Sequence, residues 1–321
     1  MLTDLAAKLR QSMGILHKQD IQIAARALGG QWNSADIILG DDCAVIPNHD
    51  GYLLLAAEGM LPQLIETDPW FAGWCSVMVN VSDIYSMGGY PIAIVDTIWS
   101  QSPDSIQELF AGMKAAAIAY QVPIVGGHTN FRSPYNALSV AILGRAENLL
   151  TSFHAQPNDV LLAAIDMRGQ FHADYPFWNA ATNVDPAQLR ENLSILPYLA
   201  KTELCDTAKD ISMGGIIGTL LMLMETSNCG AILDLDKITC PENIALEKWL
   251  TSFPSYGFLL SVRPENMEAV KAQFDRQGLV CAIVGKVQTK TQVILRSQSD
   301  SVLFWDFAQD ALTGFSLDCN V

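Results

Sequence analysis

The sequence lacks several signatures that would point to well-known classes of protein. Its 321 residues include seven cysteines, at positions 43, 75, 205, 229, 240, 281 and 319, and no two of them form a C-x-x-C pair. This spacing argues against a disulfide framework or a zinc site and indicates reduced thiols in a cytoplasmic protein. No G-x-x-x-x-G-K-[ST] occurs, because Gly285-Lys286 is followed by Val287, and no G-x-G-x-x-G follows a strand. We therefore expect neither a P-loop enzyme nor a Rossmann dehydrogenase.

Positive charge and long apolar segments are also scarce. Lys and Arg number 19 against 34 Asp and Glu, so the net charge is −15 and the pI is about 4.6. Such a surface repels phosphate backbones, which makes nucleic acid and anionic membranes poor partners. The longest apolar run, around Ile216 to Met224, is too short to span a bilayer. The N-terminal segment contains acids and no compact apolar core, so it does not resemble a signal peptide.

Apolar sequence of ordinary length is plentiful, since half of the residues are hydrophobic. A chain of this size is long enough for two domains. Strand-like and helix-like segments alternate at similar density in both halves, which predicts two mixed α/β domains, residues 1–152 and 153–321. Helices are expected at 20–28, 69–87, 103–120 (capped by Ser102), 186–200, 214–228, 241–252 and 264–277. Strands are expected at 36–39, 43–46, 52–57, 92–98, 122–125, 138–143, 231–235, 256–262 and 279–284.

The segment 69–87 is predicted to be a buried helix with an unusual polar stripe. Residues that commonly begin and end helices flank it: Asp68, Pro69, Gly88 and Gly89. Within a broad apolar surface, Ser76, Asn80 and Asp83 follow at i, i+4 and i+7 and share one face. Asp83 lies in the last turn, where the helix dipole disfavours a carboxylate. A bound cation would explain an acid at this position.

Other acids stand beside strand-like runs. Asp41 and Asp42 follow Gly40 in "LGDDCAVI", and Glu58 ends the apolar run of "YLLLAAEGM". For the first site a plain hairpin turn is the alternative, because Asp and Gly are common turn residues. For the second the alternative is a solvated strand end. Both sites could also supply oxygen ligands to a metal ion.

Two glycine-containing segments could bind phosphate. In "VPIVGGHTN" a predicted strand runs into Gly126-Gly127, followed by His128 and Thr129. Glycines at a strand end let backbone N–H groups approach a phosphate closely, and Thr129 could add a hydroxyl. A tight turn with His128 on the surface is the alternative.

The second segment is "AKDISMGG". Ser212 suits the N-cap of a strongly apolar helix, and Asp210 stands just ahead of the positive helix end. Simple capping is the alternative to a role in binding.

These residues share one chemistry. Magnesium is bound in proteins by a few carboxylates together with substrate phosphates. An acidic protein without a basic cluster could hold a nucleoside triphosphate through metal ions that bridge the two anions. The candidate oxygen ligands are Asp41, Asp42, Glu58, Asp83 and Asp210.

The order of the motifs resembles the aminoimidazole ribonucleotide (AIR) synthetase superfamily, which includes selenophosphate synthetase, thiamine-monophosphate kinase and a hydrogenase-maturation protein. The similar segments run in register from about Gly40 to Val287: Gly40-Asp41-Asp42, Glu58, "NVSDIYSMGGYP", "VGGHT" and "DISMGG". "SDIYSMGG" together with "GGHT" looks closest to selenophosphate synthetase.

The resemblance implies a two-domain α/β (α+β mixed) fold that binds ATP and Mg²⁺. It also implies a homodimer in which N-terminal strands of both protomers form a shared barrel, with the ATP sites near that seam. The acids matching Asp42, Asp83 and Asp210 bind magnesium in the family, and Glu58 stands where the family usually has an Asp ligand. The implied nucleotide contacts are Asp41, Asn80, Asp83, Gly126, Gly127, His128, Thr129 and Ser212.

Some family features are missing. Selenophosphate synthetase carries an N-terminal Cys or selenocysteine beside a Lys, but the first 39 residues here contain no Cys, and Lys18 has different surroundings. Cys319 lacks the context of the C-terminal cysteine in the hydrogenase-maturation relative. His128 stands where thiamine-monophosphate kinase has an acid. The acceptor substrate is therefore not identified by these motifs.

Two functions from different classes remain open. One is an enzyme that binds Mg·ATP and transfers a phosphoryl group to, or so activates, a small acceptor. Its catalysis would be mostly positioning and charge neutralisation, which fits the absence of a nucleophile–base pair. The alternative is a non-catalytic relative that keeps nucleotide or metal binding for regulation or assembly. The retained Asp42, Asp83 and Asp210 favour the enzyme, whereas the altered Glu58 and the missing N-terminal motif favour the alternative.

Overall fold

The computed structural model of the chain describes residues 2–28, 40–173 and 175–315. They fold into two compact units that interleave along the sequence. Unit 1 takes residues 1–41, 149–183 and 198–321, and unit 2 takes residues 42–148 and 184–197. Each unit thus includes a segment from both halves of the chain.

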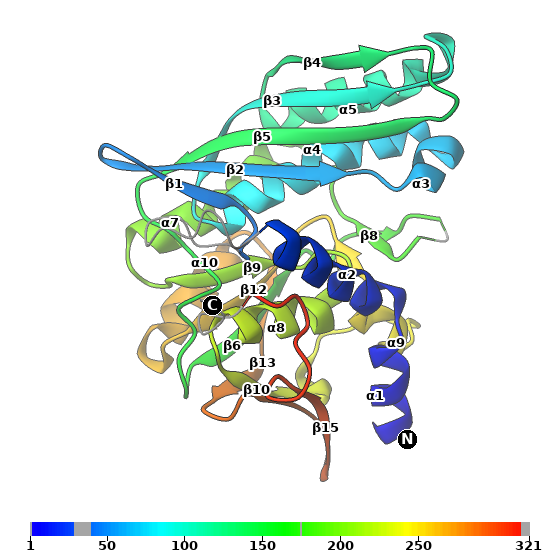
Figure 1. The fold of residues 1–321 in the computed structure, drawn as a ribbon. Coiled ribbons are helices and arrows are strands. Elements are labelled where there is room, and N and C mark those ends of the chain that lie inside the picture. The colour runs from blue at the N-terminus through cyan, green and yellow to red at the C-terminus, as the bar shows by residue number, and fades with distance from the viewer. Residues whose placement is uncertain (1, 29–39, 174, 316–321) are drawn as a thin grey trace. The chain divides into compact units, whose positions relative to one another are not determined.

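Unit 2 is built on a five-stranded sheet (Figure 1). Its strands are β1 (Ala44–Asn48), β2 (Gly51–Gly59), β3 (Tyr90–Trp99), β4 (Ile124–Asn130) and β5 (Ala137–Ala146), in the order β1-β2-β5-β3-β4. The β3–β4 pair is parallel, whereas the other three pairs are antiparallel. A parallel pair needs a crossover connection, and the helix between β3 and β4 provides it.

One face of this sheet is covered by α4 (Pro69–Ser86), and α5 (Gln107–Tyr120) packs against α4. The two helices approach closely because Gly73 and Gly112 carry no side chain at their crossing. The short helices α3 (Pro62–Thr67) and α6 (Pro186–Leu193) pack against α4 and α5, respectively. The buried strand residues of this unit include Leu54, Ala56, Ile94, Ile98, Val140 and Ile142.

The opposite face of the sheet carries apolar side chains that are partly exposed. Successive strand residues point to opposite faces, so the cross-strand pair Leu55 and Leu143 lies on the face away from the buried set. Val95, which pairs with Ala141, lies on this face too. Leu55 and Val95 are 46% and 45% exposed. The sheet thus has one core face and one apolar surface.

Unit 1 contains a seven-stranded sheet and a small three-stranded one. The large sheet has the order β15-β14-β10-β13-β6-β12-β9. Its strands are β6 (Val160–Ile165), β9 (Thr207–Asp210), β10 (Gly230–Asp234), β12 (Gly257–Val262), β13 (Val280–Gln288), β14 (Gln292–Ser297) and β15 (Asp300–Asp306). The small sheet has the order β11-β8-β7, from β7 (Gln170–Phe171), β8 (Phe177–Asn179) and β11 (Phe253–Pro254).

The helices of unit 1 centre on α8 (Gly215–Thr226), all of whose residues are buried. A helix that is hydrophobic all round belongs in a core, and α8 packs against strands β9, β10 and β12. The remaining helices are α1 (Leu2–Arg10), α2 (Met13–Leu28), α9 (Leu246–Leu250) and α10 (Met267–Arg276). In addition, α7 (Ile195–Lys201) lies where the chain passes from unit 2 to unit 1.

Several predicted elements are confirmed, and others need correction. Helix α4 has the predicted bounds within one residue, and the Asp68 side chain accepts a hydrogen bond from the Phe71 N–H at 3.1 Å. The predicted cap by Ser102 is wrong, because a 3₁₀ turn, η2 (Asp104–Ile106), precedes α5 and neither has a side-chain cap. The predicted strand 36–39 lies outside the described residues. The helices α1 and α3 and the strands β6, β7, β8, β9, β11, β14 and β15 were not predicted.

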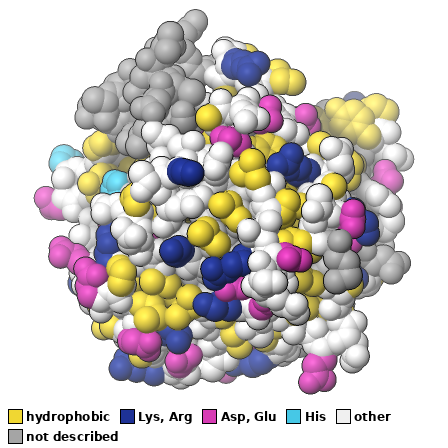
Figure 2. Space-filling view, turned by 90° about the horizontal axis from the view of Figure 1, so that it is seen from below, with side chains coloured by type: hydrophobic (Ala, Val, Ile, Leu, Met, Phe, Trp, Pro, Cys, Tyr) yellow, Lys and Arg dark blue, Asp and Glu magenta, His cyan; other side chains and the backbone are white. Residues whose placement is uncertain are grey.

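Charged and hydrophobic side chains are mixed on the face of the molecule drawn in Figure 2. On the face shown in Figure 2, Lys and Arg side chains lie close to Asp and Glu side chains and among hydrophobic ones. Over the described part of the chain, none of the helices combines the length and the apolar character needed to cross a bilayer.

Candidate functional site

Two of the predicted acids meet in unit 2. Asp42 lies two residues before β1, and Asp83 lies in the last turn of α4. Carboxylate oxygens of the two residues lie within 4.8 Å of one another, and Asp83 is 7% exposed. Like charges at this separation repel, and the C-terminal end of α4 adds partial negative charge. The arrangement favours a cation between them.

Neighbouring groups hold this pair of acids in place. Ser86 Oγ lies 2.7 Å from Asp42 Oδ2 and 2.8 Å from the Asp83 carbonyl oxygen, so its proton has two acceptors. Cys43 Sγ donates to the same carbonyl at 3.3 Å. The end of α4 and the chain before β1 are therefore tied together at the acids.

One turn back along α4, Asn80 has an unsatisfied oxygen. Asn80 is fully buried and its Nδ2 donates to the Ser76 carbonyl at 2.8 Å, but its Oδ1 has no hydrogen-bond partner among the described residues. Ser76 Oγ donates to the Gly73 carbonyl at 2.8 Å, so Ser76 is satisfied within its own helix. Of the predicted polar stripe, Asn80 and Asp83 are the residues with oxygens suited to a ligand.

A second group of candidates lies elsewhere on the same sheet. Glu58, Val140, Asp96 and Gly127 occupy one row across β2, β5, β3 and β4. Asp96 lies against Gly127, where an added Cβ would come within 2.6 Å of Asp96 Oδ1. Burial raises the pKa of the Asp96 carboxyl above its ordinary value. Among the described residues, the close acid pair of unit 2 does not include Glu58.

The segment Gly126–Thr129 has a different structure from the predicted one. The predicted strand end before the glycines is wrong, because β4 continues through all four residues to Asn130. Strand β4 is the edge of the sheet opposite β1, and the His128 ring lies 6.5 Å from the Trp99 ring, centroid to centroid. An edge strand presents backbone N–H and C=O groups on its outer side, so these groups replace the predicted turn.

In unit 1, Asp210 ends β9 and leads into the turn before α8. Asp210 is 8% exposed, and Thr219 Oγ1 donates to its carbonyl at 3.1 Å. The predicted N-cap role of Ser212 is wrong, because α8 starts after Gly214 and has no side-chain cap. Gly214 has a φ of +99°, which a residue with a Cβ rarely adopts, so the glycine pattern determined where the helix begins.

Ser212 lies next to a buried lysine side chain. Lys18, on α2, is 9% exposed, and its Nζ lies 3.3 Å from Ser212 Oγ. The aliphatic part of Lys18 lies beside Gly214 and Gly218 of the turn and of α8. No local pattern assigns Lys18 to this turn, because the contact spans 194 residues.

Asp41 is anchored within unit 1. Thr151 Oγ1 donates to Asp41 Oδ2 at 2.8 Å, and the Ser152 N–H donates to the same oxygen at 2.7 Å. Lys209 Nζ lies 3.7 Å from Asp41 Oδ1, and both side chains are almost fully buried. These contacts favour an anchoring role for Asp41 over the predicted direct nucleotide contact.

Sequence reasoning did not single out Asp96 or Lys209. For Asp96 the available signal was a charged residue inside the apolar run 92–98. For Lys209 no such signal was available, because the strand β9 that carries it was not predicted. Such a signal does not say which residue the charge meets, because the partners Gly127 and Asp41 are distant in sequence.

The described cysteines include three thiols that are poorly suited to nucleophilic chemistry. All six are free, and five of them are buried. Burial raises the pKa of the Cys205 and Cys281 thiols to about 12 and that of Cys75 further still. Thiols with such pKa values stay protonated and are poor nucleophiles. Cys319 lies outside the described residues.

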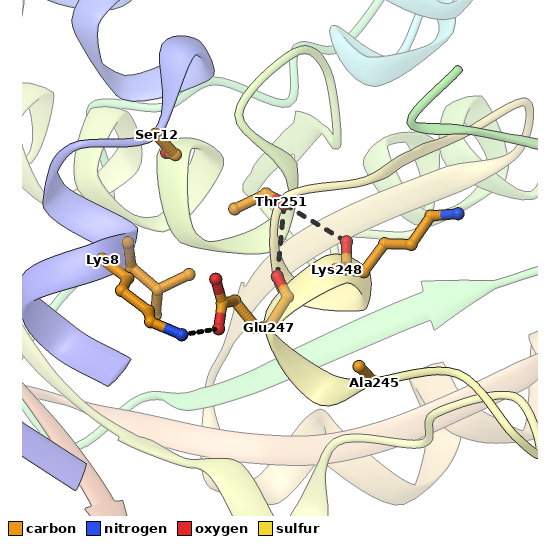
Figure 3. Close-up of a pocket in the computed structure, with 7 residues that line it drawn as sticks. Lys8, Ser12, Ala245, Glu247, Lys248 and Thr251 are labelled. Carbon is orange, nitrogen blue, oxygen red and sulfur yellow. Dashed lines mark hydrogen bonds and ion pairs between the residues drawn. The ribbon is translucent and has the colours of Figure 1, made fainter. Parts of the chain in front are cut away.

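A shallow pocket of about 380 Å³ lies between α1 and α9 in unit 1 (Figure 3). Lys8 Nζ and Glu247 Oε2 are 3.0 Å apart and neutralise each other at its wall. Lys248 Nζ lies over the Phe171 ring, 4.0 Å from its centroid. Phe171 is not among the residues that line the pocket, so the Lys248 ammonium group is engaged with a residue outside it. The residues that line the pocket include none of the predicted site residues.

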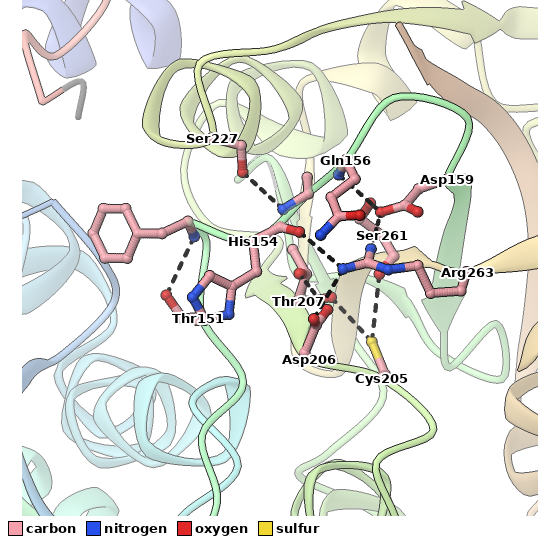
Figure 4. A network of polar contacts seen from close by, with 12 residues as sticks. Thr151, His154, Gln156, Asp159, Cys205, Asp206, Thr207, Ser227, Ser261 and Arg263 are labelled. Carbon is pink, nitrogen blue, oxygen red and sulfur yellow. Dashed lines mark hydrogen bonds and ion pairs between the residues drawn. The ribbon is translucent and has the colours of Figure 1, made fainter. Parts of the chain in front are cut away.

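A polar network in unit 1 consists of side chains that bond one another and nearby backbone groups (Figure 4). Asp159 accepts from Ser261 Oγ at 2.8 Å and from the Gln156 N–H at 2.9 Å, and Arg263 forms an ion pair with it. Arg263 also bonds Asp206 at 2.9 Å. The network joins the loops at the ends of β6, β9 and β12.

These observations define a class of protein: a mixed α/β chain of two units, with paired acids at the end of a buried helix and a third acid before a glycine turn. The chain belongs to the AIR synthase related protein family. The N-terminal domain of that family matches residues 40–146, and its C-terminal domain matches residues 161–297. The resemblance inferred from the motifs and the fold class are both confirmed.

Similar proteins extend the comparison. An uncharacterized protein of Synechocystis sp. is 57% identical, over 99% of this chain and 100% of its own length. The structure of T. maritima PurL complexed with ADP has a TM-score of 0.73 at 17% identity, and the match covers 91% of this chain and 50% of that one. The structure of AaThiL complexed with AMPPCP and TMP has a TM-score of 0.66 at 17% identity, covering 89% and 96%. At these identities the structural matches establish the fold.

Proposed function

We propose that the protein is a magnesium-dependent, ATP-binding enzyme that transfers a phosphoryl group to a small acceptor or uses ATP to activate it. The observation that carries the proposal is the pair of Asp42 and Asp83, whose carboxylate oxygens lie within 4.8 Å of one another in unit 2. Asp210 of unit 1 is the third proposed ligand. Nucleotide-bound structures of PurL and AaThiL support ATP as the cosubstrate.

The residues of unit 2 fit a magnesium ion. Mg²⁺ prefers oxygen ligands, usually one or two carboxylates with several waters retained. The buried Asn80 Oδ1 has no hydrogen-bond donor among the described residues, and leaving such an acceptor unsatisfied costs about 1–3 kcal/mol. A metal-bound water would supply the missing donor. A cation would also offset the dipole penalty of about 0.3–1 kcal/mol for Asp83 at the end of α4.

In phosphoryl transfer the protein mainly has to position the reacting groups. A bond forms between the acceptor atom and the γ-phosphorus while the bond from that phosphorus to the bridging oxygen breaks. ADP leaves with the electron pair of that bond, and the proton of the acceptor passes to solvent. When bound, magnesium supplies charge neutralisation, and the side chains hold the reacting groups in place.

The remaining predicted contacts lie on strands β2 and β4 of the sheet in unit 2. Glu58, Gly126, Gly127, His128 and Thr129 lie in or beside the row of strand residues that ends at β4. We propose that they contact nucleotide in a homodimer whose ATP sites lie near the seam between protomers, as the family resemblance implies. The free thiols of the described cysteines support a cytoplasmic location for this enzyme.

The proposal is tested by binding and turnover. Calorimetry should show tight ATP binding with Mg²⁺ and at least tenfold weaker binding in EDTA. Asp83→Asn or Asp42→Asn should weaken Mg·ATP binding at least tenfold, because each removes a charged oxygen from the ion. Glu66→Gln, an exposed acid on α3, serves as the matched control and should bind as the wild type does.

Phosphorus NMR with ATP, Mg²⁺ and a panel of small acceptors then separates the two functions. Formation of ADP together with a new phosphorylated product, or of phosphate in the presence of one acceptor, supports the enzyme. Tight Mg·ATP binding without turnover on any acceptor would indicate the non-catalytic alternative. Equal ATP affinity with and without EDTA would contradict the magnesium site itself.

A further inference from the structure

Lys209 and Asp41 form a buried ion pair that the proposed chemistry does not use. Their side chains are 3% and 1% exposed, and Lys209 Nζ lies 3.7 Å from Asp41 Oδ1. Asp41 Oδ2 also accepts from the Thr151 hydroxyl and the Ser152 N–H. All four residues belong to unit 1, so the contacts lie within one compact part of the chain.

Burying two charges is an expensive way to stabilise a fold. Desolvation costs several kcal/mol per ion, and apolar residues of similar volume often stabilise a protein as well or better. Removing only one partner leaves an uncompensated buried charge and is strongly destabilising. A pair of this kind fixes the backbone segments that carry it, because neither side chain can leave alone.

The segments fixed in this way carry the proposed ligands. Asp42 follows Asp41, and Asp210 follows Lys209, so each proposed ligand is one peptide bond from the pair, with consecutive Cα atoms about 3.8 Å apart. Lys209 and Asp210 are the last residues of β9, where successive side chains point to opposite faces. Anchoring Lys209 on one face therefore directs Asp210 to the other.

We propose that Lys209 and Asp41 are positioning residues, whose ion pair sets the backbone geometry of Asp210 and Asp42 and thereby the affinity of the metal site. The inference rests on the proposed function, since it concerns the same magnesium ligands. Lys209 acts through Asp41 and does not contact the metal or the nucleotide.

The direction in which Lys209→Met changes the metal affinity separates positioning from simple electrostatics. Lys209→Met removes a positive charge near the ligands, and by charge alone this would tighten the binding of a cation. Loss of positioning would weaken it instead. The net effect expected is a metal affinity at least tenfold weaker in Lys209→Met, whereas Lys209→Arg, which keeps the charge, should remain within about threefold of the wild type.

The experiment titrates the full-length protein with Mn²⁺ alone and follows binding by electron paramagnetic resonance, with thermal unfolding measured on each variant. Arg263→Met is the matched control, because it breaks a different ion pair with a buried acid of unit 1, the Arg263–Asp159 pair (Figure 4). It should lower the unfolding midpoint without changing Mn²⁺ affinity. This comparison separates a loss of stability from a loss of positioning.

The Mn²⁺ affinities of the variants decide whether the Lys209–Asp41 pair positions the metal ligands. A folded Lys209→Met variant with unchanged or tighter Mn²⁺ binding overturns the inference. If Lys209→Met does not fold, Thr151→Val removes one hydrogen bond from Asp41 and leaves every charge in place; it should weaken Mn²⁺ binding two- to fivefold, and unchanged binding overturns the inference. A wild-type protein that binds no Mn²⁺ contradicts the proposed function itself, so the two failures are distinguishable.

Discussion

Glu225 is the only acid in the apolar helix α8, and it is 4% exposed. Its carboxylate accepts from the backbone N–H groups of Leu312 and Thr313 at 2.7 and 2.8 Å and from the Thr313 hydroxyl at 2.6 Å. The Gly314 N–H approaches to 3.3 Å. This set of donors satisfies the buried charge and ties the last described segment of the chain to the core of unit 1.

Glu225→Gln should therefore destabilise the protein. The amide keeps one acceptor oxygen but turns an NH₂ group toward backbone N–H donors, so about 2–4 kcal/mol of the free energy of unfolding should be lost. Urea unfolding measures this change. Glu242→Gln, at an exposed acid, is the control and should change stability by less than about 0.5 kcal/mol. Equal stability of the two variants would contradict the account of Glu225.

At the residue scale, the sequence predicted the acids better than their partners. Asp42 and Asp83 were predicted as metal ligands, and the structure brings these two together. Periodicity placed Asp83 on one face of a helix, and this local argument was sufficient. The anchoring of Asp41 by Thr151 and Lys209 spans more than a hundred residues, and no local pattern predicts such a contact.

At the scale of elements, the start of α8 depends on a close contact with α2. A Cβ added to Gly14 of α2 would lie 2.6 Å from the Gly214 backbone nitrogen, so the helix and the turn meet backbone to backbone. The contact brings Lys18, one turn further along α2, to Ser212. The glycine at position 14 thus allows the Lys18 side chain to reach the turn that follows Asp210.

Gly14→Ala should force α2 away from this turn. Overpacking of a tight contact costs about 1–3 kcal/mol, so the free energy of unfolding should fall by that amount, and Mg·ATP binding should weaken with it. Gly59→Ala is the matched control, because an added Cβ there meets nothing within 4 Å. Thermal unfolding and calorimetry measure both effects. A Gly14→Ala variant as stable as Gly59→Ala would show that the contact is easily relaxed.

The elements were predictable to different degrees. Helix α4 carries its own start and stop residues, so its bounds were predicted within one residue. Strand β4 was predicted too short, because two glycines usually end a strand, whereas here pairing with β3 holds them in extended conformation. Pairing between strands is a non-local interaction, and it outweighed the local preference of the glycines.

At the scale of the whole molecule, the open face of the sheet in unit 2 is the feature still to be explained. Leu55, Leu143 and Val95 lie on the face that α4 does not cover, and the first and last are nearly half exposed. An apolar sheet face of this kind is unusual on a monomer and commonly marks an interface. A second copy of the chain is the occupant that the family resemblance implies, in an isologous dimer.

Light scattering at micromolar concentration should therefore give a mass twice the 35.0 kDa of the chain. Leu55→Arg, which places a charge on the open face, should shift the protein to the monomer because the charge would be buried unpaired in the interface. Ile118→Arg is the matched control, since Ile118 is 64% exposed but lies on α5, away from the sheet. A wild-type monomer, or a dimer equally disrupted by both substitutions, would rule out this face as the interface. If Leu55→Arg also abolishes Mg·ATP binding while Asp83→Asn leaves the dimer intact, then the nucleotide site depends on the dimer and the dimer does not depend on the site.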